Sequence, residues 1–290
     1  MSHDLSLSNK SEEIKIGRRN FSWGSRTFVM GVINATPDSF SGDGLESSVD
    51  SMLSKARNFQ DLGADIIDIG GESTRPPGLY AGSKPVSLNE ELSRVIPAID
   101  ILAQDLDIPI SVDTYKAEVA SMALASGASM VNDIWALQRD PDMSSVVASA
   151  GVPVVLMHNQ GGTNYKDVVT EIIESLFMLI EDAVGKGVER KNIIIDPGVG
   201  FGKTAEQNLE VIRRLQEFKK LNCPLLVGVS RKSTIGYVLD LPADQRVEGT
   251  AACVALSIAG GADIVRVHDV KEMIRVSKMS DAIVRGWRNS

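Results

Sequence analysis

The sequence predicts an α/β protein that folds as a (β/α)8 TIM barrel in a single domain. Eight short apolar runs each end at a polar or charged side chain, and segments with helical periodicity separate these runs. Functional side chains of such barrels lie at the carboxyl ends of the strands, so the polar residues predict one active site on one face. A doubly wound open sheet is the alternative, but it would confine its chemistry to a single switch point.

The eight apolar runs are the predicted strands. They are rich in Val and Ile and almost continuously apolar, as expected for parallel strands that are buried on both faces. The polar residues that end or interrupt them are, in chain order, Asn34, Glu72, Asp113, Asn132, His158, Asp196, Ser230, Arg266 and His268.

Helical periodicity follows the strands, and several of these segments begin after Asp, Ser, Thr or Asn and end at Gly. Ahead of the first strand, residues 14–23 predict a β-hairpin with its turn at 17–20, which we expect to close the bottom of the barrel. Residues 1–13 are predicted to be a flexible tail, and residues 14–290 form the barrel domain. The predicted helices span 49–63, 87–104, 117–127, 144–151, 166–187, 205–221, 246–261 and 270–287.

Composition narrows the class of protein. A length of 290 residues fits one barrel, and no apolar run approaches the length of a membrane span. The polar start of the chain predicts a cytoplasmic protein without a signal peptide. A net charge of −8 argues against nucleic-acid binding. Cys223 and Cys253 form no CxxC pair, so inert thiols are expected rather than a disulfide or zinc site.

Two connections are long and rich in Gly, Pro and Ser, at 35–44 and 73–87. Both follow predicted strands, so both belong to the catalytic face, where long irregular loops are typical of lids or binding loops. A tolerated surface insertion is the alternative.

Asp113, Asn132 and Asp196 end three strands and are expected to converge on the barrel mouth. Two carboxylates and an amide there suit a heterocycle with an amino group and a ring N–H. The alternative role is helix capping, which fits Asp133 best. It fits Asp196 least, because PGVGFGKT precedes the next helix.

The segment DPGVGFGKT is not a phosphate loop, since Pro197 stands where the motif requires Gly. Its glycines are expected to bring the backbone close to a ligand, beside the flat ring of Phe201. Lys232 directly follows a strand and is predicted to take part in the chemistry, and Ser233 opens a helix whose N-terminus attracts anions.

Arg266 lies inside a predicted strand, where burial requires an anionic partner. A structural Arg–Asp pair is one possibility. With Arg75, Lys232 and His268 nearby in the barrel, a phosphate or pyrophosphate is the preferred ligand. Asn34 is predicted to help position a Mg²⁺ that binds mainly through the phosphates. His158 either lines the site or caps the next element.

Eight motifs together resemble the dihydropteroate synthases of folate biosynthesis: NATPDSFSGDG, GGESTRP, ISVDT, VNDI, DPGVGFGKT, SRKS, EGTAA and RVHDV. The resemblance runs in order from about Thr27 to the C-terminus. It implies condensation of 6-hydroxymethyl-7,8-dihydropterin pyrophosphate with p-aminobenzoate, with Mg²⁺, in a homodimer. The reaction would break the C–O bond first, and the arylamine would then attack a pterin-methyl cation.

The resemblance also implies residue roles. Lys232, Asp113 and Asp38 would be catalytic. The pterin would contact Asp113, Asn132, Met157, Asp196 and Lys232. Pyrophosphate would contact Asn34, Arg75, Arg266 and His268, with Asn34 also at the metal. The p-aminobenzoate would contact Thr74, Pro76, Phe201, Lys232 and Ser233.

Two departures from the family concern the p-aminobenzoate pocket: residues 77–84 lengthen the second loop, and Thr234 stands where an aromatic residue is usual. Two alternatives stay open. A methyltetrahydrofolate–corrinoid methyltransferase barrel would share the strand-end Asp and Asn residues but would not need SRKS and RVHD. A non-catalytic pterin-binding paralogue would not need Lys232, Arg266 and Asn34.

Overall fold

The computed structural model describes residues 13–35, 45–72 and 86–287. The predicted tail, apart from its last residue, lies outside these ranges, as does most of both predicted lids. Within the described part of the chain, no helix is long and apolar enough to cross a membrane.

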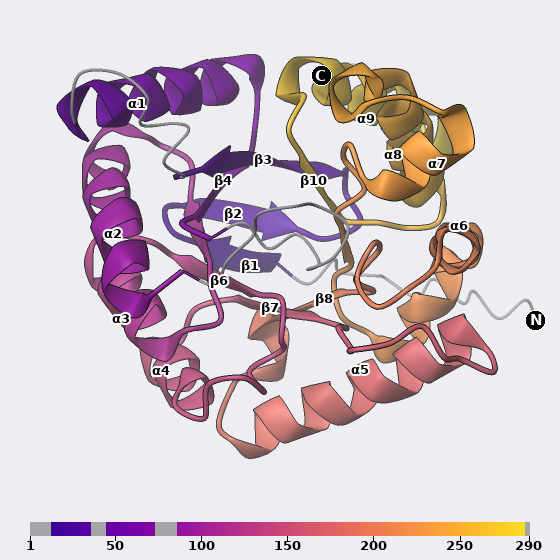
Figure 1. Cartoon of the computed structure of the whole chain (residues 1–290), viewed down its shortest axis with the longest axis horizontal. Coiled ribbons are helices and arrows are strands. Elements are labelled where there is room, and N and C mark those ends of the chain that lie inside the picture. The colour runs from indigo at the N-terminus through magenta and orange to yellow at the C-terminus, as the bar shows by residue number, and fades with distance from the viewer. Residues whose placement is uncertain (1–12, 36–44, 73–85, 288–290) are drawn as a thin grey trace, which may run out of the picture.

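Eight parallel strands form the barrel (Figure 1), and their order in the sheet is β8-β7-β6-β5-β4-β3-β10-β9. The ring closes between its two end strands through a bridge from Ile195 to Leu225, where the Ile195 amide donates to Pro224 O at 2.9 Å. The strands are β3 (Phe28–Asn34), β4 (Ile66–Gly70), β5 (Ile110–Asp113), β6 (Met130–Asp133), β7 (Val154–Met157), β8 (Ile193–Asp196), β9 (Leu226–Val227) and β10 (Ile264–Val267). The predicted barrel is confirmed.

Helices surround the strands (Figure 1) and bury their apolar faces against the outside of the sheet. A row of Val and Ile side chains from the strands meets them there, which explains the nearly continuous apolar runs. The helices are α1 (Leu45–Leu62), α2 (Leu88–Asp105), α3 (Ala117–Ala125), α4 (Met143–Ala150), α5 (Val168–Gly185), α6 (Ala205–Arg213), α7 (Ser233–Leu239), α8 (Val247–Ala259) and α9 (Val270–Val284).

The helix predicted over 205–221 is wrong in its second half. The α-helix α6 ends at Arg213, and residues Leu215–Leu221 form the 3-10 helix η3. Leu215, Phe218 and Leu221 are buried at intervals of three residues. A 3-10 helix has three residues per turn and places all three in one line, whereas an α-helix of 3.6 residues per turn would spread them over about 120°.

An antiparallel hairpin of β1 (Glu13–Ile16) and β2 (Arg19–Ser22) closes one end of the barrel. Its Ile14, Ile16 and Phe21 are buried in one cluster with inward-facing residues near the strand starts, such as Ile66 and Met130. The predicted plug is therefore confirmed. Its turn is tighter than expected, because Ile16 pairs with Arg19 and only residues 17 and 18 remain in the turn.

Candidate active site

A polar layer lies inside the barrel beyond the apolar plug. Successive side chains of a strand alternate in direction, so the residue two positions after a plug residue also faces the interior. In β4 this step leads from Ile66 to Asp68, which is fully buried. The same step of two residues applies in three other strands. It leads from Met130 to Asn132 in β6, from Ile194 to Asp196 in β8, and from Ile264 to Arg266 in β10.

Arg266 joins two carboxylates in this layer. Its Nε donates to Asp68 Oδ2 at 2.6 Å, and Nη2 donates to Asp113 Oδ2 at 2.6 Å. Asp68 Oδ2 also accepts from Asn132 Nδ2 at 3.0 Å. The structural Arg–Asp pair considered from the sequence therefore exists, and it holds the guanidinium of Arg266 at a fixed angle in the barrel mouth.

The Asp113 carboxyl is arranged to receive a donor. Burial raises its pKa to about 7, although the nearby charge of Arg266 opposes that rise. Its Oδ1 is buried and accepts no hydrogen bond from any described residue. A buried acceptor without a partner is costly, so a ligand N–H that reaches Asp113 Oδ1 removes that cost. The alternative of helix capping does not hold for Asp113, since its side chain faces the barrel interior and not the start of α3.

Lys232 and Phe201 lie together beside this layer, and Lys232 is within reach of the charges of Asp196, Arg266 and Asp113. Burial lowers the pKa of Lys232 to about 8, while Asp196 acts in the other direction. The Lys232 ammonium lies 4.2 Å from the centroid of the Phe201 ring and donates to Val199 O. Gly200 makes this contact possible, because a Cβ at its φ of +88° would lie 2.7 Å from Lys232 Cδ. Gly200 thus allows a close approach of the loop to Lys232, and the predicted approach of its glycines to a ligand stays a prediction.

Asp196 is buried at the end of β8, and burial raises its pKa. Its Oδ1 accepts the Gly198 amide at 2.7 Å, so one carboxylate oxygen shapes the loop. Asp133 is purely structural, since its two oxygens accept the amides of Trp135 and Leu137, both at 2.8 Å.

His268 lies at the end of β10, with its Nδ1 3.0 Å from Ser230 Oγ. Burial, followed by the positive charges of Arg266 and Arg231, lowers the pKa of His268 to about 4. The imidazole is therefore neutral at pH 7. An anion bound beside it would offset both cations and raise its pKa.

Ser233 is the first residue of α7, and Thr234 follows it in the first turn. Thr234 is buried and its Oγ1 accepts from Asn208 Nδ2 at 3.0 Å. Asn208 Oδ1 in turn accepts the Gly200 amide at 2.7 Å. An aromatic side chain at position 234 has no hydroxyl in that place, so Thr234 ties the start of α7 to the glycine-rich loop.

His158 does not cap the next helix, because Asp167 accepts the Thr170 amide at the start of α5. Its ring lies below the glycine-rich loop instead, with Nδ1 3.2 Å from the ammonium of Lys203. Burial and the Lys203 charge lower the pKa of His158 to about 3.

The remaining predicted site residues divide into two groups. Met157 is buried at the end of β7, and Asn34 is exposed at the end of β3. Four others lie outside the described residues: Asp38, Thr74, Arg75 and Pro76.

Two residues of this region were missed from the sequence, namely Asp68 and Lys203. Asp68 carried a usable signal, because an Asp within the apolar run ADIIDIGG is as unusual as Arg266 in its own strand. Lys203 carried none, since its role depends on how the loop folds back.

No group of three or more His, Cys, Asp or Glu side chains among the described residues is arranged to hold a metal ion. Neither Cys223 nor Cys253 forms a disulfide, and burial raises the pKa of Cys253. The expected inert thiols are thus half-buried rather than fully buried.

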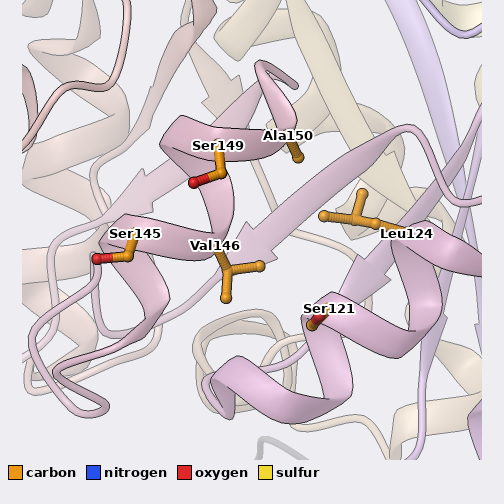
Figure 2. Close-up of a pocket in the computed structure, with 6 residues that line it drawn as sticks. All are labelled: Ser121, Leu124, Ser145, Val146, Ser149 and Ala150. Atoms are coloured by element: carbon orange, nitrogen blue, oxygen red, sulfur yellow. The ribbon is translucent and has the colours of Figure 1, made fainter.

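A depression of about 440 Å³ lies on the outer wall, between α3 and α4 (Figure 2). Its lining holds no charged side chain and no residue of the polar layer. The residues that line it are Ser121, Leu124, Ser145, Val146, Ser149 and Ala150.

The fold and polar layer define a barrel enzyme with its site at the strand ends, and the comparisons give its class, the pterin-binding enzymes. The sequence model of the family described as "Pterin binding enzyme" matches residues 30–268. The dihydropteroate synthase of Clostridium beijerinckii is 49% identical over 273 residues, which cover 94% of this chain and 100% of that protein. The dihydropteroate synthase of Bacillus subtilis is 51% identical and covers 91% of this chain and 90% of its own length.

Solved structures give the same result. The crystal structure of a Clostridium difficile dihydropteroate synthase in the presence of pteroic acid aligns with a TM-score of 0.87 and 52% identity, over 91% of this chain and 99% of that one. The Xanthomonas albilineans dihydropteroate synthase in complex with 7,8-dihydropteroate aligns with a TM-score of 0.85 and 37% identity, over 94% and 98%. The chain belongs to the dihydropteroate synthase family of pterin-binding enzymes.

Proposed function

We propose that the barrel mouth condenses 6-hydroxymethyl-7,8-dihydropterin pyrophosphate with p-aminobenzoate and releases pyrophosphate. One observation carries the proposal: acceptors for the N–H groups of a ligand and a set of cations lie in a single layer. The acceptors belong to Asp113, Asn132 and Asp196, and one oxygen of Asp113 has no partner among the described residues. Arg266 and Lys232 supply the positive charge beside it.

The first substrate is bound through its pterin and its pyrophosphate. Asp113, Asn132 and Asp196 accept or exchange hydrogen bonds with the amino group and ring nitrogens of the pterin, and Met157 packs beside it. Charge-assisted bonds of this kind are about twice as strong as neutral ones. We assign the binding of the pyrophosphate to Arg266 and His268, together with Asn34 and Arg75.

The reaction begins when the C–O bond to pyrophosphate breaks and both bonding electrons leave with the phosphate oxygen. The cations of the site lower the energy of that charge separation, and one preorganised contact is worth about 3–4 kcal/mol. The lone pair of the arylamine nitrogen then forms the C–N bond, and the nitrogen passes its extra proton to the released pyrophosphate or to water. We assign the catalysis of these steps to Asp38, Lys232 and Asp113.

The second substrate is assigned to the wall formed by Phe201 and Lys232. Its aromatic ring lies against Phe201, and its carboxylate is directed to Ser233. Thr74 and Pro76 of the second loop complete this pocket. The contact of 4.2 Å between the Lys232 ammonium and the Phe201 ring supports the assignment, because it fixes both side chains at one edge of the pterin site.

Magnesium is proposed as the cofactor. Asn34 offers a neutral oxygen at the exposed end of β3, and the described residues hold no acidic cluster there. That donor set suits Mg²⁺, which keeps several waters and binds mainly through phosphates. When bound, it supplies neutralisation of the leaving-group charge.

Purified protein with both substrates and Mg²⁺ is expected to form dihydropteroate and pyrophosphate in equal amounts. Excess EDTA should stop product formation, and added Mg²⁺ should restore it. Binding of dihydropterin pyrophosphate without any product would favour the non-catalytic paralogue. Transfer of a methyl group from methyltetrahydrofolate to a corrinoid would favour the methyltransferase.

We also propose a homodimer formed through α7, α8 and α9. Large apolar side chains are exposed on this face, including Leu256 (60%), Met279 (63%) and Ile283 (71%). The variant Ile283→Arg is expected to shift sedimentation from dimer to monomer. Met178→Arg on α5, where Met178 is 65% exposed, is the matched control and should leave the oligomer unchanged.

The cytoplasm is the proposed location, which cell fractionation tests. The two cysteines without a disulfide agree with a reducing compartment.

A further inference from the structure

The glycine-rich loop 197–203 rests on a buried lysine that has no part in the reaction described above. Lys203 is only 9% exposed. Its ammonium donates to Gly198 O at 3.0 Å and to Phe201 O at 2.9 Å, and it lies 3.2 Å from His158 Nδ1. An ammonium has three N–H donors, and these three acceptors use all of them.

The acceptors keep Lys203 in place against the cost of burial. Burial lowers its pKa to about 7, and Asp196 acts in the opposite direction. The neutral His158 ring contributes an acceptor because its own pKa is held low by burial. The loop carbonyls and this imidazole therefore form a cage for the ammonium.

The loop requires such support because its glycine-rich backbone has little preference for any one conformation. Gly198, Gly200 and Gly202 all have positive φ angles, of +68°, +88° and +56°. Glycine loses more conformational freedom on folding than any other residue. At Gly198 the chain also passes so close to His158 that an added Cβ would lie 2.0 Å from its carbonyl oxygen.

The same loop fixes the proposed arylamine wall. The carbonyl of Val199 accepts from the Lys232 ammonium, and the Phe201 ring lies 4.2 Å from that ammonium. Lys203 holds the carbonyl groups on either side of Val199, those of Gly198 and Phe201. A displacement of the loop thus moves the ring of Phe201 and the head of Lys232 together.

We propose that Lys203, with His158, is a positioning residue that sets the shape of the 198–202 loop and thereby the Phe201–Lys232 wall at which the arylamine binds. This inference rests on the proposed function for the identity of the second substrate. Of the residues assigned to the first substrate, only Lys232 and Asp196 contact the loop, and the others belong to the strands, so its affinity is expected to change less than that of the arylamine.

The test compares Lys203→Met, which keeps length and apolar bulk but removes all donors, with the parent protein. Hydrogen exchange of the 198–202 amides is expected to accelerate about tenfold, while strand amides keep their rates. The KM for p-aminobenzoate is expected to rise about tenfold or more, because misplacement by about 1 Å is costly. The Kd for dihydropterin pyrophosphate should stay within about threefold.

Arg285→Met is the matched control, since Arg285 is a half-buried cation that also donates to a backbone carbonyl, Ala262 O at 2.9 Å, on the plug side of the barrel. It should lower the melting temperature without changing either substrate affinity. If Lys203→Met does not fold, His158→Leu removes only one acceptor and is measured in the same way, with smaller changes of the same kind expected.

Loop exchange within about twofold of the parent, or an equal loss of affinity for both substrates, overturns the proposal. A parent protein that makes no dihydropteroate refutes the proposed function instead. The exchange measurement does not use catalysis, so it still decides the role of Lys203.

Discussion

Asp68 gives the sharpest prediction, because one carboxylate oxygen serves two site residues. Oδ2 accepts from Arg266 Nε at 2.6 Å and from Asn132 Nδ2 at 3.0 Å. The variant Asp68→Asn keeps the shape but removes the negative charge. The ion pair with Arg266 becomes a hydrogen bond from a cation to a neutral oxygen, and the bond from Asn132 becomes neutral on both sides. Each such bond loses about 1–1.5 kcal/mol, which gives roughly 2–3 kcal/mol in total.

That loss should be visible in two measurements. A chain of this size shifts its melting temperature by about 2 °C per kcal/mol, so calorimetry should record a fall of roughly 4–6 °C. Asn132 and Arg266 also lose their common anchor, so the Kd for dihydropterin pyrophosphate should rise about tenfold, equivalent to about 1.4 kcal/mol. Isothermal titration without the arylamine measures this affinity directly.

Asp65→Asn is the matched control on the opposite side of the barrel. Asp65 immediately precedes β4, and it accepts from Arg26 Nη1 at 2.9 Å and from the Val29 amide at 2.8 Å. Its substitution should lower the melting temperature without changing the Kd. A parent-like Kd for Asp68→Asn, with only the melting temperature reduced, would refute the idea that Asp68 organises the ligand site.

Three further predictions concern the Phe201–Lys232 wall and the anion site. Lys232→Met should lower kcat about 10²–10³-fold in a pyrophosphate-release assay, while circular dichroism stays unchanged, and near-normal turnover would remove Lys232 from the mechanism. His268, whose pKa is about 4, should take up a proton more readily when pyrophosphate binds, so its imidazole resonances should report a higher pKa and anion affinity should increase as pH falls below 7. The resonances of His158 should not move, and an unshifted His268 would contradict its place beside the anion. Thr234→Val leaves Asn208 Nδ2 without its acceptor and should cost about 1–3 kcal/mol of unfolding free energy by denaturant titration, whereas an unchanged stability would show that the link to Gly200 is dispensable.

The barrel could be predicted because its signals are local. Alternation within IVRVHD places Arg266 inside the barrel, and the structure confirms this. Convergence of Asp113, Asn132 and Asp196 follows in the same way, since parallel strands end on one face. The α6 break could not be predicted from periodicity alone, because the apolar residues of η3 fit a helix of either pitch until the packing is known.

Lys203 and Asp68 were missed as site residues, because their roles depend on contacts that only the folded chain creates. Lys203 follows a glycine-rich loop in which no periodicity relates position to direction, so its contact with His158 depends on backbone angles that the sequence does not specify. Asp68 was overlooked because an isolated charge in an apolar run has many possible partners. Its pairing with Arg266 joins residues 198 positions apart, a distance that only the closed barrel removes.

The double pairing of Arg266 shows its structural role and leaves one of its nitrogens for the proposed functional role. Asp68 and Asp113 use Nε and Nη2, and the described residues give Nη1 no hydrogen bond. Two carboxylates beside one guanidinium make an excess of negative charge, yet burial raises the pKa of Asp113 to about 7 and so reduces that excess near neutrality. Under the proposed function, the donors of a bound pterin would favour the ionised form of Asp113, whereas a bound anion would oppose it. The two ligand groups would then act on the same Asp113–Arg266 pair in opposite directions, and this pair would couple the two proposed sites.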